Sequence, residues 1–160
     1  MDQQRCHTRT EGEQLTLADF LPYRLSVLSN TISEHIADAY RREFDLSVSQ
    51  WRVIAVLFGD PGLSAKEVSQ RTAMDKVAVS RAVSKLIEQG RLKRKSAQND
   101  GRLSTLHLTA AGKAVYTSVA PKALAFEKKL ISELSTDDRA AISRILGKLS
   151  KAVSPDHPLW

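Results

Sequence analysis

Basic side chains are concentrated in one segment of the chain, from residue 76 to residue 102. This segment contains eight Lys or Arg residues and two acidic ones, so its net charge of +6 equals the formal net charge of the whole chain. The basic residues are Lys76, Arg81, Lys85, Arg91, Lys93, Arg94, Lys95 and Arg102. A charge excess confined to one short stretch is typical of a surface that binds polyanions. The pattern predicts double-stranded DNA as a partner.

Residues 76–89 predict an amphipathic helix that presents part of this charge. At about 100° per residue, Val79, Ala82, Val83 and Leu86 share one side of the helix. The residues predicted to contact DNA from the rest of its surface are Lys76, Val77, Ser80, Arg81, Ser84 and Lys85. Arg bonds bidentately to guanine, Ser donates or accepts, and a Val methyl can meet the thymine methyl, so this face suits a major groove. The alternative is an ordinary solvated face, because Lys, Arg and Ser cover the outside of most helices.

A β-hairpin is predicted directly after this helix. The runs from Leu92 to Ala97 and from Leu103 to Leu108 have strand-like composition, and residues 98–101 between them supply turn chemistry. Arg102 near the tip can enter a narrow minor groove, where Asp100 could orient its guanidinium, and Lys93 and Lys95 are predicted to contact phosphates. The alternative is that Asp100 and Gly101 are ordinary turn residues and that Arg102 is simply solvated.

Helix start signals locate the elements that must position these residues. Ser47 with Gln50 predicts a capping box before the apolar run 51–58, which we expect to be a helix buried nearly all round. Ser64 with Glu67 predicts a second box for a short helix that reaches about residue 72. Asp75 caps the basic helix, which ends at Gly90. Short helices joined by a tight turn predict a helix-turn-helix.

Long helices are expected on both sides of this module. Apolar residues recur at three- and four-residue steps and predict one amphipathic helix from about Leu15 to Arg42, with Pro22 setting its start or kinking it. Thr109 caps a second long helix, interrupted or bent near Pro121, and Ser135 with Asp138 opens the last one. The expected fold is mainly α with a small β-hairpin wing. Residues 1–14 form a tail, 15–45 and 110–154 dimerisation helices, and 46–109 a winged helix-turn-helix.

The central residues resemble the winged helix-turn-helix core of the MarR family of bacterial transcription regulators. The resemblance rests on Val79-Ser80-Arg81, Leu86 through Gly90, Asp100-Gly101-Arg102, Leu106, Leu108-Thr109 and Gly112. It spans roughly residues 46–112 in detail, and the flanking helices agree in layout. It implies a homodimer that binds a palindromic operator, with the helix after Asp75 in the major groove and Arg102 in the minor groove. The stretch 50–53 also resembles members that control the breakdown of aromatic acids.

Dimerisation is predicted independently by the flanking helices. Their apolar stripes lie outside the compact winged module and have little core of their own to cover, so a second copy is expected to bury them. Two-fold symmetry then places two recognition helices on one face of the DNA. The alternative is a monomer whose helices fold back as a bundle.

A small-molecule effector is a further implication of the resemblance, and its pocket is expected where the dimerisation helices meet the winged domain. The candidate lining residues are Tyr23, Arg24, His35, Tyr40, Trp51 and Arg52. Aromatic and arginine side chains there could hold a planar carboxylate, such as an aromatic acid or its coenzyme A thioester. Three of them have alternatives: Trp51 as plain core packing, Arg52 as an ion-pair partner of Glu43 or Asp45, and His35 in the dimer core. Effector binding would release a repressor by changing the spacing of the two subunits.

Other classes of function lack support in the sequence. No phosphate-binding loop, nucleophile elbow or carboxylate pair predicts an enzyme, and the four scattered histidines predict neither a metal site nor a cofactor. Cys6 could make the chain a redox-sensing regulator, but its place in the tail favours an inert thiol. A protein-interaction module independent of nucleic acid is the remaining alternative. The composition, with 42% apolar and 26% charged residues and no long apolar run, predicts a globular cytoplasmic protein without a membrane partner.

Overall fold

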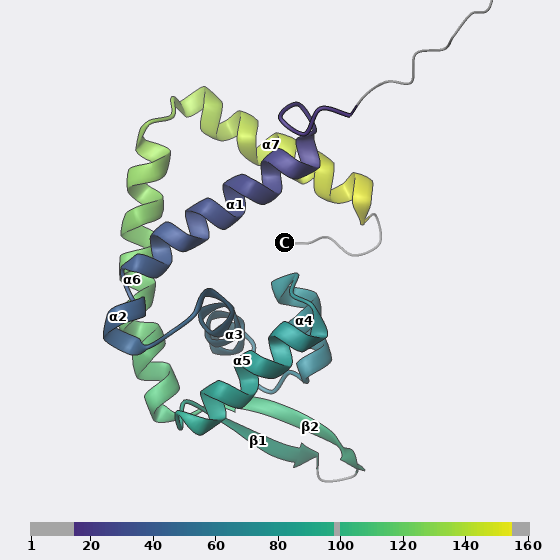
Figure 1. The fold of residues 1–160 in the computed structure, drawn as a ribbon, viewed down its shortest axis with the longest axis vertical. Coiled ribbons are helices and arrows are strands. Elements are labelled where there is room, and N and C mark those ends of the chain that lie inside the picture. The colour runs from purple at the N-terminus through teal and green to yellow at the C-terminus, as the bar shows by residue number, and fades with distance from the viewer. Residues whose placement is uncertain (1–14, 98–99, 155–160) are drawn as a thin grey trace, which may run out of the picture. The chain divides into compact units, whose positions relative to one another are not determined.

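The computed structural model of the chain describes residues 15–97 and 100–154, and for residues 97 and 100–103 it describes the backbone alone. The helices are α1 (Leu21–Asp38), α2 (Arg41–Phe44), α3 (Val48–Gly59), α4 (Ala65–Thr72), α5 (Lys76–Glu88), α6 (Ala110–Ser132) and α7 (Thr136–Val153). The strands β1 (Leu92–Ala97) and β2 (Asp100–Leu108) form an antiparallel hairpin between α5 and α6 (Figure 1). The predicted class, mainly helical with one small hairpin, is therefore confirmed.

Two compact units meet between Ser33 and Glu34, within α1. In the first unit, the amides of Asp19 and Phe20 donate to the carbonyl of Thr16 and form a turn, so the helix begins only at Leu21. Pro22 then lies in the first turn, where its missing N–H leaves no intrahelical bond unmade. The expected start at residue 15 was wrong, and Pro22 marks the start of the helix.

The predicted end of this first helix was also wrong, because the chain forms two helices there. The amide of Tyr40 donates to Ala37 in a tight terminal turn, and Tyr40 itself leaves the helical region with φ of −132° before α2 begins. The ring of Tyr40 is only 1% exposed. The break between α1 and α2 coincides with the burial of this ring in the second unit. The spacing of apolar residues in the sequence could not show that burial.

The core of the second unit joins α3, α4, α5, the hairpin and the first half of α6. Its buried members come from every one of these elements and include Val53, Ile54, Leu57, Val68, Val79, Val83, Leu86, Leu92, Leu106, Val115 and Val119. The capping boxes at Ser47, Ser64 and Ser135 are all present, as are the caps at Asp75 and Thr109. These caps satisfy amide groups that the first turn of each helix leaves without partners.

The hairpin is tied to the helices at its base. Leu92 pairs with Leu108 and Lys93 with His107, and β2 begins at Asp100, three residues earlier than predicted. The loop after α3 pairs with β2 as well, because the amide of Gly62 donates to Leu106 and the amide of Leu106 donates to Leu63, at 3.0 and 2.8 Å. Gly112 lets α6 approach the same base, since a Cβ there would lie 2.1 Å from the carbonyl oxygen of Arg91.

Two expectations about the helices need correction. The helix at residues 48–59 is not buried all round, because Phe58 is 40% exposed. The ring of Phe58 stacks on Tyr116 with centroids 3.7 Å apart. Pro121 does not interrupt α6, which continues on both sides of it. Proline removes a single N–H donor, and here the residues that follow it keep helical geometry. None of the helices in the described part of the chain is long and apolar enough to span a membrane.

Candidate nucleic-acid interface

Helix α5 has two distinct faces, one apolar and buried and one polar and outward, and a tight turn precedes it. Ala73 ends α4 in the left-handed region with φ of +51°, and the carboxylate of Asp75 accepts from the amide of Ala78 at 2.8 Å. The inward face consists of Val79, Ala82, Val83 and Leu86, each at most 5% exposed. The outward residues are Lys76, Val77, Ser80, Arg81, Ser84 and Lys85, and all six are exposed. All the outward residues predicted on this helix are therefore solvent-exposed, and Lys85 among them pairs with Glu88 at 3.3 Å.

Val77 is the unusual member of this outward set. It is an apolar side chain, yet it is 59% exposed in the first turn of α5. Helical spacing places it beside Ser80 and Arg81, at i+3 and i+4. A methyl-bearing side chain next to an arginine and a hydroxyl can contact a thymine methyl while its neighbours make hydrogen bonds to base edges.

The basic residues of β1 are divided between the two faces of the hairpin. Leu92 is buried, so the alternation along a strand places Arg94 on its side and Lys93 and Lys95 on the other. All three basic side chains are exposed. His107 shares the lysine face, where desolvation first and then the charges of Lys95 and Lys93 lower the pKa of its imidazole. Arg94 was not among the residues predicted to contact DNA, and the alternation places it on the opposite face from Lys93 and Lys95.

The two residues predicted at the wing tip are described only in part. The backbones of Asp100 and Arg102 belong to β2, but their side chains lie outside the described residues. The predicted minor-groove contact of Arg102 and the orienting role of Asp100 therefore remain predictions.

The candidate effector residues are divided among three places. Tyr23 and Arg24 are exposed on the first unit. In the second unit, Tyr40 and Trp51 lie together with ring centroids 5.8 Å apart. His35 stacks instead on Phe126, with centroids 6.2 Å apart.

Two aromatic residues that the sequence analysis missed complete this group. Trp51 stacks on Tyr116 with centroids 5.7 Å apart, and Tyr116 stacks in turn on Phe58. We call Tyr40, Trp51, Tyr116 and Phe58 the aromatic cluster. No sequence signal identified Tyr116, because α6 reaches Trp51 only through the tertiary fold.

Tyr40 carries a buried polar atom that has no hydrogen-bond partner among the described residues. Its hydroxyl is buried and makes no hydrogen bond to any of the described residues. Desolvation by burial raises its pKa to about 12, and the charges of Arg41 and Arg52 oppose this shift while Glu34 adds to it. Half-buried Arg52 is therefore close enough to act on this hydroxyl electrostatically. The pair offers a hydrogen-bond donor and a positive charge beside aromatic rings.

The suggested ion pairs of Arg52 involve residues that have other partners. Glu43 pairs with Lys122, and the carboxylate of Asp45 accepts from Gln89. No group of three His, Cys, Asp or Glu residues within the described ranges is arranged to hold a metal ion. Cys6, named for the redox alternative, lies outside the described residues.

Two short helices joined by a tight turn and followed by a basic hairpin define a winged helix-turn-helix, a DNA-binding class. Residues 44–103 match the model of the MarR family. The chain resembles a solved MarR/EmrR family transcriptional regulator from Acinetobacter sp. ADP1, with 26% identity, a TM-score of 0.78 and coverage of 88% of this chain and 99% of that one. The winged helix-turn-helix of this chain is therefore of the MarR family type, as the resemblance predicted.

Further relatives agree with this assignment. The HTH-type transcriptional regulator TcaR of Staphylococcus aureus is 25% identical over 119 residues, which cover 73% of this chain and 78% of TcaR. The structure of Bordetella bronchiseptica BpsR shares the fold, with a TM-score of 0.74, 20% identity and coverage of 86% of this chain and 97% of that one. The MarR family and TcaR are transcriptional regulators and not enzymes.

Proposed function

We propose that the chain is a repressor that binds an inverted-repeat operator as a homodimer and is released by a small aromatic effector. The observation that carries the DNA-binding part is the division of α5 into a buried apolar face and an outward face of six exposed residues that includes three cations. Arg81 and Ser80 would contact base edges, Val77 a thymine methyl, and Lys76, Ser84 and Lys85 the rims of the groove. Operator binding would place the protein in the cytoplasm of a bacterium.

The hairpin extends this proposed surface to the neighbouring groove. Arg102 would enter the minor groove, oriented by Asp100, because a narrow minor groove concentrates negative potential. Lys93 and Lys95 would neutralise phosphates, which stabilises binding to any sequence and makes it dependent on salt. The exposed side chains of both lysines support their part of this assignment.

Apolar side chains exposed on the flanking helices support the homodimer. Leu28 of α1 is 57% exposed, Leu124 of α6 is 62% exposed and Ile145 of α7 is 47% exposed. A monomer rarely leaves so many large apolar residues in water, and a second copy of the same helices would cover them. A two-fold dimer presents its recognition helices to successive major grooves of an inverted repeat.

The aromatic cluster is the proposed effector site within the second unit. A carboxylate or phenolate of the effector would accept a hydrogen bond from the Tyr40 hydroxyl and lie near Arg52, while its ring would pack on Trp51. Tyr23, Arg24 and His35 are proposed to contribute in the dimer. BpsR, whose DNA binding is described as regulated by 6-hydroxynicotinic acid, is an aromatic-acid precedent with the same fold. We propose an aromatic acid or its coenzyme A thioester as the effector.

Selection of an operator from random duplexes tests the DNA-binding part. Fluorescence anisotropy at several salt concentrations should give an affinity that falls linearly in log salt. Arg102→Ala should weaken operator binding at least tenfold, whereas Lys151→Ala, near the end of α7 and away from the winged module, should change it less than twofold. No selected sequence at low salt, or an Arg102→Ala protein that binds like wild type, would contradict the model.

A thermal-shift screen of phenolic acids and their coenzyme A thioesters tests the effector part. A stabilising compound should also release the wild-type protein from its operator, and Tyr40→Phe should weaken that release. A compound that stabilises and releases both proteins equally would exclude the Tyr40 hydroxyl from the site.

A further inference from the structure

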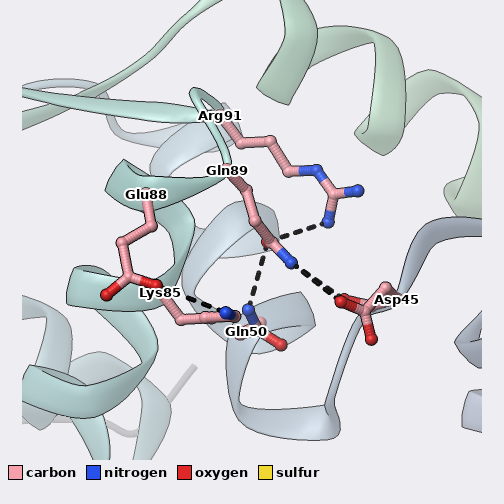
Figure 2. A network of polar contacts seen from close by, with 6 residues as sticks. All are labelled: Asp45, Gln50, Lys85, Glu88, Gln89 and Arg91. Carbon is pink, nitrogen blue, oxygen red and sulfur yellow. Dashed lines mark hydrogen bonds and ion pairs between the residues drawn. The ribbon is translucent and has the colours of Figure 1, made fainter.

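Gln89 lies at the C-terminal end of α5 and uses both ends of its amide (Figure 2). Its Nε2 donates to the main-chain oxygen and to Oδ2 of Asp45, at 3.2 and 3.3 Å. Its Oε1 accepts from Nε2 of Gln50 at 3.3 Å and from Nη1 of Arg91 at 3.0 Å. One side chain therefore joins the end of α5 to the start of α3, the start of β1 and the corner before α3.

The corner at Asp45 has a backbone conformation that L-residues seldom adopt. Asp45 ends α2 with φ of +46° and ψ of 56°, in the left-handed region. Such conformations persist where the surroundings hold them. Here Gln89 holds the carbonyl of Asp45, and Nη2 of Arg91 donates to the carbonyl of the preceding residue, Phe44. The direction of the chain at this corner is thus held by one side chain at the end of α5, Gln89, and by one just before β1, Arg91.

The short helix before the corner, α2, also contacts α6 and α1. Glu43 forms an ion pair with Lys122 of α6, and Nζ of Lys122 lies 5.6 Å from the centre of the Phe44 ring. Arg41 pairs with Glu34 near the end of α1. Helix α2 therefore has contacts with the flanking helices on one side and with the end of α5 on the other.

Apolar packing does not fill the space between this corner and α5. A hollow of about 250 Å³ lies there, and its lining residues are Arg41, Asp45, Leu46, Ser47, Gln50 and Lys85. Side chains that close-pack resist relative movement, whereas a hollow does not. Leu46, the residue after the corner, is buried in the same core as Leu86 of α5, and on the side of the hollow the hydrogen bonds of Gln89 add a polar connection between the corner and the C-terminal end of α5.

We propose that Gln89 is a positioning residue that locks the end of α5 to the corner at Asp45 and so sets the direction in which α5 presents its outward face to DNA. The inference rests on the proposed contact of α5 with an operator. Displacement of α2 by the flanking helices would move α5 through these bonds. Base contacts need an accurately placed helix, whereas attraction to phosphates does not, so the lock should affect specific binding far more than non-specific binding.

One substitution can remove the side-chain hydrogen bond between Gln89 and Asp45, and a second substitution can restore it. Glu at position 89 keeps the acceptor for Arg91 and Gln50 but cannot donate to Asp45. Asn at position 45 has an amide that can donate to such a Glu, so Gln89→Glu with Asp45→Asn restores the side-chain bond with its polarity reversed, while the bond to the main-chain oxygen of residue 45 stays lost. Asn also tolerates the left-handed backbone. The double variant has the same net charge as wild type.

The measured quantity is the ratio of affinity for the selected operator to affinity for random DNA of equal length. Gln89→Glu should lower this ratio about tenfold, which corresponds to roughly 1.4 kcal/mol, the size of one or two lost hydrogen bonds. Gln89→Glu with Asp45→Asn should return it to within about threefold of wild type. The charge-matched control, Gln89→Glu with Glu88→Gln, should stay low because it restores charge without a donor at position 45. Asp45→Asn alone keeps acceptors for Gln89 and should change the ratio less than twofold.

The outcomes separate this inference from the proposed function. If wild-type protein prefers no DNA sequence, the proposed function fails. If wild type selects an operator and Gln89→Glu keeps its ratio, the lock is wrong while the function stands. If the affinity ratio recovers equally in the control variant with Glu88→Gln, the loss in Gln89→Glu is due to charge, and the lock is also wrong. Should Gln89→Glu fail to fold, a double variant that folds and regains the ratio supports the lock, and one that folds without regaining it refutes it.

Discussion

Removing the hydroxyl of Tyr40 by the substitution Tyr40→Phe is expected to stabilise the folded protein. The hydroxyl is buried and has no hydrogen-bond partner among the described residues, whereas the ring contacts Trp51. Burying a hydroxyl without a partner costs about 1–3 kcal/mol by mutational data, and phenylalanine keeps the ring contacts while removing that cost. The free energy of unfolding at neutral pH should therefore rise by about 1 kcal/mol, which corresponds to roughly 2–4 °C in Tm for a chain of this size.

The loss of stability at alkaline pH gives a second prediction that is independent of the first. Burial raises the pKa of Tyr40 from 10.0 to about 12, so the folded state holds this proton more tightly than the unfolded state. The corresponding stability is fully present below pH 10 and is lost as the pH rises through the folded pKa. Two pKa units correspond to about 2.7 kcal/mol. Tyr40→Phe lacks this ionising group. Between pH 10 and pH 12 its free energy of unfolding should therefore fall by about 2.7 kcal/mol less than that of wild type.

Urea unfolding at one fixed protein concentration measures both effects, because the stability of a dimer depends on concentration. Tyr23→Phe is the matched control, since Tyr23 is 45% exposed and its hydroxyl reaches solvent. The control should stay within about 0.5 kcal/mol of wild type at neutral pH. A Tyr40→Phe protein that is less stable than wild type, with an equal loss of stability at alkaline pH, would show that the hydroxyl has a partner and would refute the reasoning.

Three further predictions concern DNA and assembly. Arg81→Ala should weaken operator binding by about 1–3 kcal/mol and relax base preference at one position. Affinities for operators that carry each of the four bases at every position would show this. Uniform weakening at every position would contradict a base contact. Lys93→Gln or Lys95→Gln should lower affinity for all sequences alike and reduce the slope of log affinity against log salt by about 1; a change in specificity would exclude phosphate contact. Leu146→Glu on α7 should shift sedimentation from dimer to monomer and weaken operator binding, and an unchanged dimer would place the interface elsewhere.

The local parts of the fold could be predicted from the sequence, because their causes lie within a few residues. The caps at Ser47, Ser64 and Asp75 depend on a side chain and an amide three residues apart, and all three formed where predicted. The inward and outward faces of α5 follow from helical spacing and from the difference between apolar and polar side chains. The helix proposed to contact DNA, with its two faces, could therefore be predicted from the sequence.

Periodicity was less informative where a residue left its helix for a distant partner. The apolar stripe reached Ala39 and the helix was predicted to continue to about Arg42, yet the chain turns after Asp38 and Tyr40 is buried in the second unit. The residues around Pro121 illustrate the opposite case, since a local breaker did not end α6. In both places a local preference was outweighed by the surrounding structure.

The sequence by itself determined the class of the protein, the helix-turn-helix with its hairpin, and the charge concentrated on them. Only the tertiary structure brought Tyr116 against Trp51 and left the Tyr40 hydroxyl without a partner among the described residues. Only the tertiary structure joined Gln89 to Asp45, which lie 44 positions apart. The reason is physical: caps and amphipathic faces arise between neighbours along the chain, whereas the partner of a buried or bridging side chain depends on how whole elements pack.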